Sequence, residues 1–435
     1  MKFGINTLDD LEVKDKTVLC RIDINEPVDR NTGTLRDTTR IEACIPTLRE
    51  LADKGARLVL LAHQGSDIEY KNFYTTEPHA AVLSALLGRE VRFIDDVCGP
   101  AAREAIRALR GGEILLLDNV RFVAEEQTLF ETKLLLSHEE QAKTLLVRKL
   151  APLADLYVND AFAAAHRDQP SLCGFERLLP SAMGRLFEEE FGVISGLMEN
   201  PGRPCVFVLG GAKINDAFLM MRTVLKRGTA GVRGGSADLV LTGGLVGEVL
   251  LWAEDADIGE GARAFIEKEG YASLLGAAKE LLAQYRDRIL LPEDFAAVRE
   301  GRREEYPLGR IPKSALVLDI GTKTAARYEE RIRSAGTVFV NGPMGVFEEE
   351  ATERGTRMVW DALGDTPAYT VIGGGDSIAA ARKYGKTGAI DYICTGGGAL
   401  IRFLTGEELP VVKALRFGSR LPLPGGRPGS HARAC

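Results

Sequence analysis

The sequence of 435 residues lacks the features that mark several classes of protein. It contains no apolar run long enough to cross a bilayer, and its opening stretch, MKFGINTLDDLEVKDK, has no hydrophobic signal segment. Positive charge is also in deficit, because 55 Lys and Arg face 62 Asp and Glu and leave a net charge of −7. An acidic chain is a poor partner for nucleic acid or an anionic membrane surface. We therefore expect a cytoplasmic protein that binds neither.

Cysteine is present but never in pairs. The seven cysteines are scattered, none forms a CxxC motif, and most lie in apolar runs such as TVLC and RPCVFVL. This pattern predicts reduced, buried thiols and argues against a disulfide framework or a zinc site.

Several catalytic signatures are missing as well. The absence of GxxxxGK[ST], of the HRD and DFG set, and of GxSxG excludes a P-loop NTPase, a protein-kinase core and a nucleophile-elbow hydrolase. The GGGDSIAAA segment supplies Gly373 and Gly375, but Ile378 stands where a dinucleotide fingerprint requires its third glycine. Dinucleotide binding is therefore weakly supported.

Glycine is in excess, because its 47 residues are about 11% of the 435, against a typical share of about 7%. Many of these glycines punctuate five segments of the second half that show the pattern strand, glycine turn, helix: VFVLGGAKINDAF, LVLTGGLVGEV, TVFVNGPMGVF, YTVIGGGDSIA and YICTGGGALI. One such turn is commonly only tight turn geometry. Five of them favour a phosphate-binding face, because glycine lets the backbone N–H groups of a helix N-terminus approach an anion.

Strand and helix patterns alternate along the whole chain, which predicts an α/β protein with mainly parallel sheets and, given the length, two domains. In the first half each apolar strand turns polar where it ends, and ligands in such sheets gather beyond those ends. These polar positions are Asp23, Asn25, His63, Asn119, Arg121, Asn159 and Asp160.

The charged residues at these ends differ between the halves. Arg21, Arg40, Arg121, Arg167 and His63 in the first half suggest an anion pocket, although a single arginine is usually a solvated surface charge. In the second half, three charged residues lie beside glycine turns. Lys213 can neutralise a phosphate, Asp376 can hold Mg²⁺ or cap a helix, and Glu348 can contact a ribose or favour a first helical turn. Together the two halves indicate phosphoryl transfer between an anionic metabolite and a nucleotide.

At these residues the chain resembles the phosphoglycerate kinase family, and in detail its archaeal-type branch. Any one motif is weak, but the set occurs in the family's order up to about residue 416. The motifs are RIDIN (21–25), TTRI (38–41), LAHQG (61–65), DNVRF (118–122), VNDAFAAAHR (158–167), GGAKI (210–214), NGPMGVFE (341–348), GGGDS (373–377) and TGGGA (395–399).

The resemblance implies reversible transfer of phosphate between ATP and the carboxylate of 3-phosphoglycerate, giving 1,3-bisphosphoglycerate and ADP, in glycolysis and gluconeogenesis. It assigns the acid to Asp23, Asn25, Arg40, His63, Gln64, Gly65, Ser66, Arg121 and Arg167. It assigns the nucleotide to Lys213, Glu348, Gly374, Gly375, Asp376 and Ser377, with Mg²⁺ on Asp376. For the transferring phosphoryl group the candidates are Arg40, Lys213, Gly375 and Gly398.

The expected architecture follows from the same resemblance: two Rossmann-like three-layer lobes with mainly parallel sheets, joined by a hinge helix, in a monomer or small homo-oligomer. The predicted parts are an acid-binding lobe at 1–183, the hinge helix at 184–203, a nucleotide-binding lobe at 204–405, a segment at 406–416 that packs back on the first lobe, and a disordered tail at 417–435.

The sequence departs from the family pattern where HQGS places Ser66 at the position of a usual arginine. Ala217 also replaces a lysine found in many relatives, and DIGTKT replaces a GP-containing turn. Three alternatives therefore stay open: a kinase for another phosphorylated carboxylic acid, a non-catalytic nucleotide-binding relative, and a nicotinamide dehydrogenase.

Overall fold

The computed structural model describes residues 1–29, 31–65, 73–228 and 234–424. Contacts divide the chain into two compact units, which are described separately below. Unit 1 comprises Met1–Gly192 and Glu408–Cys435, and unit 2 comprises Val193–Glu407. The helix α8 (Arg185–Glu199) runs from the first unit into the second.

Unit 1 is built on a six-stranded parallel sheet with the order β3-β4-β2-β1-β5-β6. The apolar strands expected in the first half are present, and the short β6 joins them at one edge. The strands are β1 (Thr17–Arg21), β2 (Arg57–Leu61), β3 (Val91–Ile94), β4 (Ile114–Leu117), β5 (Leu156–Asn159) and β6 (Ser181–Met183).

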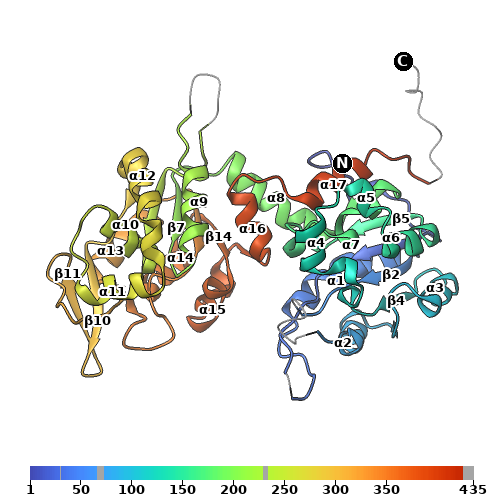
Figure 1. Ribbon diagram of the computed structural model, residues 1–435, viewed down its shortest axis with the longest axis horizontal. Helices are drawn as coiled ribbons and strands as arrows, with labels where there is room; N and C mark the ends of the chain where they lie inside the picture. Colours follow the sequence, from blue (N-terminus) through green and yellow to red (C-terminus); the bar gives the residue numbers. More distant parts are fainter. Residues whose placement is uncertain (30, 66–72, 229–233, 425–435) are drawn as a thin grey trace. The chain divides into compact units, whose positions relative to one another are not determined.

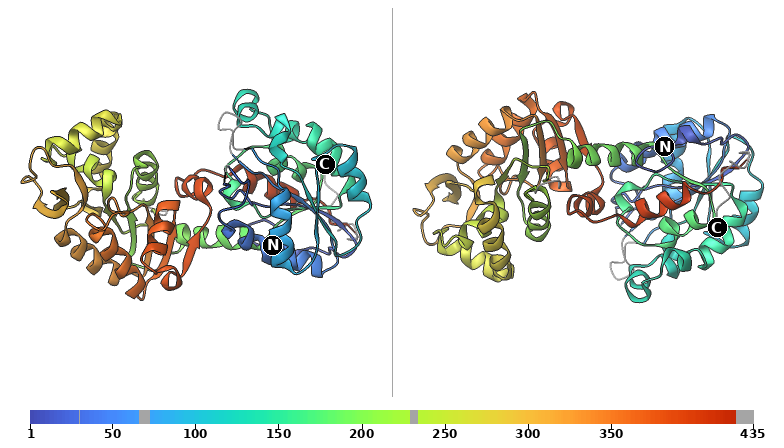
Figure 2. Two further views of the ribbon diagram at one scale, coloured as in Figure 1. Left: turned by 90° about the horizontal axis from the view of Figure 1, so that it is seen from below. Right: turned by 90° about the horizontal axis from the view of Figure 1, so that it is seen from above.

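Helices cover both faces of this sheet (Figure 1 and Figure 2). Alternate residues of a strand point to opposite faces, and here they enter two separate cores. Val18 and Cys20 belong to one core, and Leu19 of the same strand belongs to the other. The helices are α1 (Thr39–Asp53), α2 (Glu77–Leu87), α3 (Pro100–Arg107), α4 (Thr128–Leu134), α5 (His138–Gln141), α6 (Leu145–Leu150) and α7 (Pro170–Cys173).

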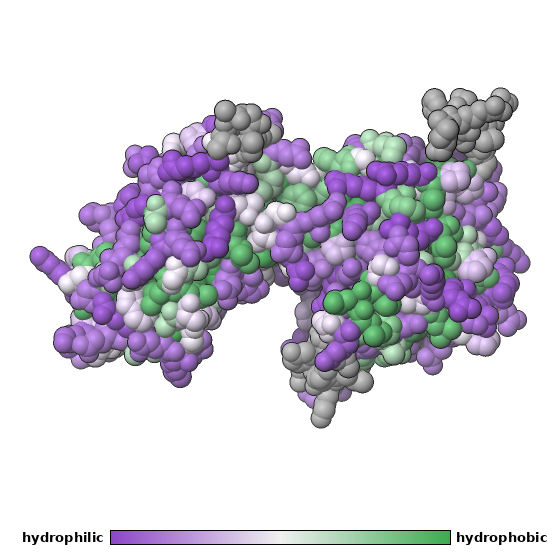
Figure 3. All heavy atoms as spheres, turned by 45° about the horizontal axis from the view of Figure 1, so that its top comes forward, coloured by the Kyte–Doolittle hydropathy of each residue, from purple (hydrophilic) through white to green (hydrophobic). Residues whose placement is uncertain are grey.

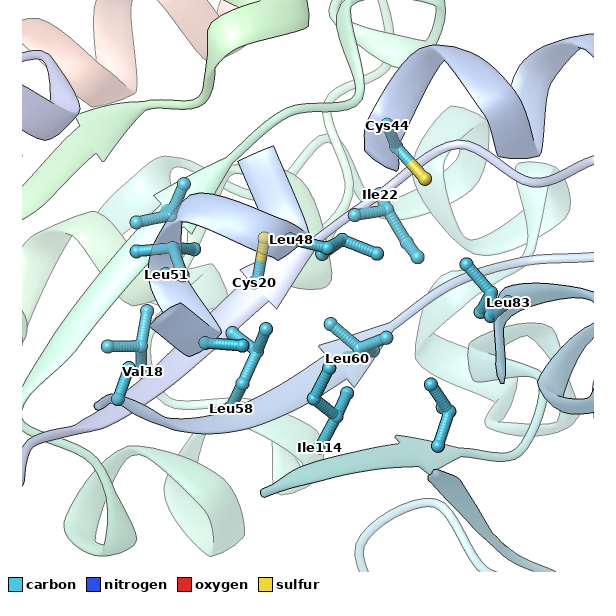
Figure 4. Close-up of a cluster of buried hydrophobic side chains, with 14 of the residues drawn as sticks. Val18, Cys20, Ile22, Cys44, Leu48, Leu51, Leu58, Leu60, Leu83 and Ile114 are labelled. Carbon is cyan, nitrogen blue, oxygen red and sulfur yellow. The ribbon is translucent and has the colours of Figure 1, made fainter. Parts of the chain in front are cut away.

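Figure 4 shows the first of these cores, where the sulfur atoms of Cys20 and Cys44 lie among leucine, isoleucine and valine side chains. Burial raises the pKa of both thiols well above its ordinary value. The described cysteines are all free. The prediction of reduced thiols without a disulfide framework is therefore confirmed for this part of the chain.

The helix α17 (Pro410–Gly418) completes unit 1 and packs against α7, β6 and the short 3-10 helix at Phe175–Arg177. Beyond it Ser419 is buried, and its Oγ accepts a hydrogen bond from the backbone N–H of Asn6. The predicted disordered tail at 417–435 therefore begins too early, because these buried contacts order its first residues. Residues 425–435 lie outside the described chain.

Unit 2 has a second six-stranded parallel sheet with the order β15-β14-β13-β7-β8-β9. The five strand, glycine turn, helix segments predicted from sequence supply five of its strands. The strands are β7 (Cys205–Leu209), β8 (Leu239–Thr242), β9 (Ile289–Leu290), β13 (Thr337–Asn341), β14 (Tyr369–Gly373) and β15 (Tyr392–Cys394).

The helices of unit 2 pack on this sheet, and α13, α14 and α15 share one core with its central strands. They are α9 (Ile214–Val224), α10 (Gly244–Ala253), α11 (Glu260–Lys268), α12 (Leu275–Tyr285), α13 (Thr322–Arg333), α14 (Arg354–Asp365), α15 (Gly375–Lys383) and α16 (Gly397–Leu404). A small antiparallel sheet adds β10 (Asp294–Arg299), β11 (Arg302–Pro307) and β12 (Val317–Ile320) in the order β11-β10-β12.

The two lobes of mixed α/β structure with mainly parallel sheets are as predicted. Hydrophilic residues cover much of the face in Figure 3, with hydrophobic residues exposed in smaller groups. None of the helices in the described ranges has the length and apolar character needed to span a membrane.

Candidate functional site

In unit 1 the candidate residues lie beyond the carboxyl ends of β1 and its neighbours. The sheet order places β2 on one side of β1 and β5 on the other, so the chain reverses its winding direction there. Such a switch point leaves a crevice at the strand ends that commonly binds a ligand. Arg21 is the last residue of β1, and Asp23 and Asn25 lie on the segment that leaves the strand.

Arg21 and His63 form the buried centre of this group. The Arg21 guanidinium donates from Nη2 to Nδ1 of His63 at 3.1 Å and from Nε to Ser171 Oγ at 3.0 Å. Burial lowers the pKa of His63 well below its ordinary value. Four arginine charges lower it further, those of Arg21, Arg121, Arg167 and Arg40. The imidazole is therefore neutral, and the arginines predicted from sequence do converge on it.

Arg40 lies in the first turn of α1, where two carboxylates position it. Its Nη1 donates to Asp23 Oδ2. Its backbone N–H donates to Glu26 Oε1 at 2.6 Å, and the N–H of Ile41 shares the same oxygen at 3.2 Å. Glu26 thus satisfies two free donors at the helix N-terminus, as a capping residue does. Burial raises the pKa of Glu26. The cap is therefore a partly desolvated carboxyl group that accepts hydrogen bonds from the helix backbone.

The segment after β2 is held by reciprocal hydrogen bonds. The Gly65 N–H donates to Asn25 Oδ1 at 2.7 Å, and Arg121 Nη1 donates to the Gly65 carbonyl at 2.8 Å. Gln64 binds the backbone of Glu26 through both ends of its amide. These contacts connect Asn25, Gln64, Gly65 and Arg121, all predicted from sequence. Ser66 lies outside the described residues.

The sequence analysis missed Glu26 and two further buried residues of this network. The side chain of Glu126 is fully buried and accepts from the backbone N–H and the Oγ of Ser171, at 2.5 and 2.8 Å. Burial raises its pKa to about 7, although Arg21 and Arg121 lower it. His79 bonds Gln64 Oε1 through Nε2 at 2.9 Å. Nothing in the sequence signals that this acid is buried, since Glu126 stands in an ordinary AEEQ run.

Arg167 is at the edge of the group. Its Nη1 donates to Thr128 Oγ1 at 3.1 Å and lies 3.9 Å from a Glu131 oxygen, and its side chain is about a quarter exposed. Arg167 is thus more solvated than Arg21 and Arg121, which are buried, and less exposed than Arg40.

In unit 2 the corresponding switch point lies at β7, which has β13 on one side and β8 on the other. The glycine turns that follow these strands interlock there. Gly211 donates its N–H to the carbonyl of Pro343 at 2.8 Å, and Gly210 donates to that of Asn341 at 3.0 Å. A Cβ on Gly210 would lie 2.1 Å from the Pro343 carbonyl oxygen. These positions admit only glycine, which explains part of the glycine excess.

The N-terminus of α15 is open. Gly374, with φ +88°, precedes the helix, and a Cβ on Gly375 would meet nothing within 4 Å. Asp376 is exposed in the first turn, whereas Ser377 is buried and its Oγ accepts from the Gly342 N–H at 2.8 Å. The helix cap is Gly374, so the interpretation of Asp376 as an N-cap is wrong. The exposed carboxylate of Asp376 is an oxygen ligand of the kind that fits Mg²⁺, and the open backbone N–H groups beside it can bind phosphate oxygens.

The remaining candidates of unit 2 lie on other turns at the same edge of the sheet. Lys213 is exposed immediately before α9, and Gly398 is exposed in the first turn of α16. Glu348 is exposed in the loop before α14, and Lys383 of α15 binds its backbone carbonyl at 3.0 Å. Helix α14 begins only at Arg354, so Glu348 does not lie in a first helical turn. Among the hydrogen bonds described for this chain, none involves the side chain of Lys213 or that of Glu348.

Comparison with known proteins shows the family to which this chain belongs. The family model of phosphoglycerate kinase matches residues 8–407. This chain belongs to the phosphoglycerate kinase family. It is therefore a phosphotransferase, as the resemblance implied, and not a dehydrogenase.

The relatives of this family are similar over nearly their whole length. The phosphoglycerate kinase of Methanothermobacter thermautotrophicus is 47% identical over 95% of this chain and 97% of its own, and that of Thermococcus kodakarensis is 44% identical over 94% and 96%. The phosphoglycerate kinase structure from Pyrococcus horikoshii matches with a TM-score of 0.83 and 41% identity, over 95% of this chain and 98% of its own. The structure from Coxiella burnetii matches with a TM-score of 0.78 and 28% identity, over 94% and 98%. The predicted likeness to the archaeal-type branch is confirmed by these mainly archaeal relatives.

Proposed function

We propose that this phosphoglycerate kinase catalyses reversible phosphoryl transfer from ATP to the carboxylate of 3-phosphoglycerate, with the acid bound in unit 1 and the nucleotide in unit 2. The observation that carries this division is the difference between the two switch points. In unit 1 buried guanidinium groups surround a neutral imidazole. In unit 2 glycine turns open the N-terminus of α15.

In unit 1 the acid would be held by fixed charge. Guanidinium groups bind carboxylate and phosphate in a bidentate manner, and Arg121 and Arg167 supply them for the substrate phosphate. Arg21 has only donors, so His63 Nδ1 must accept its hydrogen bond. The proton of the neutral ring is then on Nε2, which can donate to a substrate oxygen. Asn25 and Gly65 hold the adjoining backbone in place.

Arg40 would stabilise the transferring phosphoryl group. Its bond to Asp23 and the attachment of its backbone to Glu26 restrict both ends of the residue. A guanidinium that is positioned before reaction pays little reorganisation cost when negative charge develops. We assign Arg40 the catalytic role and Asp23 and Glu26 the role of positioning it.

In unit 2 the nucleotide phosphates would lie at the helix N-termini. The N–H groups of Gly375 and Gly398 are in the first turns of α15 and α16, and Lys213 adds a full positive charge. Because the Ser377 hydroxyl is engaged with Gly342, Ser377 would contribute its backbone N–H. Glu348 would bind the ribose hydroxyls. Asp376 would hold Mg²⁺, which neutralises phosphate charge when bound.

The reaction needs no general base. A carboxylate is already ionised at neutral pH, so one of its oxygens attacks the γ-phosphorus while the bond to the ADP oxygen breaks. What the protein supplies is in-line positioning and neutralisation of charge on the phosphoryl oxygens. The residues assigned above are of this kind: positive groups, backbone donors and the carboxylates that orient them.

The test is a coupled assay on the purified full chain with Mg-ATP and a series of acids. We expect ADP formation with 3-phosphoglycerate and little with acids that lack its phosphate, because Arg121 and Arg167 then have no partner. Faster turnover with a different phosphorylated acid would favour the alternative substrate that HQGS suggests. The absence of turnover with every acid would favour a non-catalytic relative.

A further inference from the structure

Unit 1 contains a second group of ionisable side chains that the proposed reaction does not use. His138 begins α5, Cys173 ends α7, and Asp168 lies in the loop directly before α7. His138 Nε2 is 3.2 Å from Asp168 Oδ1, and the ligand atoms of all three residues lie within 4.8 Å of one another. In the described ranges this is the single group of three or more such residues with this proximity.

The three donors are those that zinc prefers. Imidazole nitrogen, carboxylate oxygen and thiolate sulfur bind Zn²⁺ at about 2.0 to 2.3 Å, which places neighbouring ligands of a tetrahedral ion about 3.5 Å apart. The His138–Asp168 separation of 3.2 Å is close to that value and the other two separations do not exceed 4.8 Å, so small side-chain movements would suffice. A divalent cation, one carboxylate and one thiolate also sum to zero charge, which lowers the cost of burying the ion.

A neighbouring side chain gives an independent indication of a ligand. Gln141 is almost fully buried, and its Nε2 donates to Asp168 Oδ1 at 2.5 Å. Its Oε1 is also buried and has no hydrogen-bond partner, and the same is true of Nδ1 of His138. Buried polar atoms without partners are rare and costly in native proteins. The surroundings of Asp168 thus contain buried polar atoms that the hydrogen bonds of the protein leave unsatisfied.

We propose that His138, Asp168 and Cys173 bind a zinc-class divalent cation, with Gln141 orienting Asp168 and water completing the coordination. On binding, the S–H bond of Cys173 breaks, its proton passes to solvent, and a sulfur–metal bond forms without change of oxidation state. The carboxylate of Asp168 and the neutral imidazole of His138 bind without losing a proton. Two carboxylates nearby, those of Glu131 and Glu139, offset the charges of Arg167 and Arg177. Burial raises the pKa of the neighbouring Glu176 well above its ordinary value, which favours its neutral form.

The proposed site shares a segment with the acid-binding site but does not depend on it. Asp168 follows Arg167 directly, and the Cys173 thiol donates to the Arg167 carbonyl at 3.8 Å. The sequence argument against zinc rested on the absence of CxxC pairs. It could not detect this group, because its members come from separate elements.

Cobalt is the probe, since Co²⁺ bound to a thiolate shows a charge-transfer absorption that Co²⁺ on oxygen ligands lacks. The full chain, stripped with chelator, is titrated with Co²⁺ and then with Zn²⁺. We expect one Co²⁺ per chain with that absorption, and its loss on adding Zn²⁺. Co²⁺ at Asp376 would be silent in this spectrum.

Three variants complete the experiment. Cys173→Ser should abolish the charge-transfer absorption, and Asp168→Asn should weaken Co²⁺ binding at least tenfold. Cys98→Ser, which changes a half-buried thiol of the same unit outside the group, should leave both unchanged. If Cys173→Ser does not fold, Asp168→Asn alone decides. No charge-transfer absorption in the unaltered chain, its persistence in Cys173→Ser, its loss in Cys98→Ser, or unchanged affinity in Asp168→Asn would each overturn the proposal.

Discussion

Arg21 and His63 are joined by a buried hydrogen bond of 3.1 Å between Nη2 and Nδ1. Because arginine cannot accept, this bond fixes the tautomer of the imidazole, and the surrounding arginines keep it neutral. His63 is thus a neutral hydrogen-bond donor in a positive site, and several consequences can be measured.

The first concerns His63 itself. Its lowered pKa means that the folded state binds fewer protons than the unfolded state as the pH falls below about 6.5. The unfolding free energy should therefore decrease on acidification through that range, and less so in His63→Gln, which keeps a donor. NMR titration should show no protonation of His63 between pH 8 and pH 5.5. A midpoint near 6.5 would contradict the buried neutral state.

Arg40→Ala should lower kcat at least 100-fold, because about 2.7 kcal/mol of transition-state stabilisation would be lost. Arg36→Ala is the matched control, since Arg36 is an exposed residue of the same region paired with Asp29. Steady-state kinetics with saturating Mg-ATP and acid measure both. Near-normal kcat in Arg40→Ala would exclude the catalytic role.

Glu248 in α10 is buried, and burial raises the pKa of its carboxyl to about 8. The folded state then holds a proton that the unfolded state releases from about pH 4.5 upwards, so stability should fall between that pH and about 8. At pH 7 the cost is about 3 kcal/mol. Glu248→Gln should remove this pH dependence in denaturant unfolding, whereas Glu267→Gln, on an exposed helical surface, should retain it. Parallel pH profiles for all three proteins would refute the assignment.

Gly210→Ala should destabilise unit 2 by about 2 kcal/mol or more, because its Cβ would collide with the Pro343 carbonyl. The same change at Gly276 in α12 meets nothing within 4 Å and should be neutral or stabilising by up to about 1 kcal/mol. Thermal unfolding compares them, and ATP binding should weaken only in Gly210→Ala. Equal melting temperatures would mean that the interlocked turns are not tight.

Asp376→Asn should raise the Mg²⁺ concentration required for half-maximal turnover at least tenfold, because a neutral amide binds the cation more weakly than a carboxylate. Asp365→Asn, an exposed acid at the far end of α14, is the control. An unchanged Mg²⁺ requirement in Asp376→Asn would remove it from the proposed metal site.

The strands that carry the sites were predictable because each is an apolar run that ends in polar or glycine residues. The strand β11 was not, since its charged sequence RREEYP carries no apolar pattern and lies at a sheet edge. The three-residue β6 was too short to separate from the helical stretch around it.

The site residues were predictable where a local sequence pattern marks them. Arginines at strand ends pointed to an anion pocket, and the glycine turns pointed to phosphate. Glu26 and Glu126 were missed because each acquires its role from burial beside partners distant in sequence, the backbone of Arg40 for one and Ser171 for the other. Acidic residues in a polar run look the same whether exposed or buried.

The central claim is transfer of phosphate to a carboxylate, and the product of that transfer is an acyl phosphate. Phosphorus NMR of the full chain with Mg-ATP and 3-phosphoglycerate measures it directly. We predict ADP and an acyl phosphate signal in equal amounts, and neither when the acid is omitted. Release of inorganic phosphate from ATP at the same rate with and without the acid, and no acyl phosphate signal, would contradict the account.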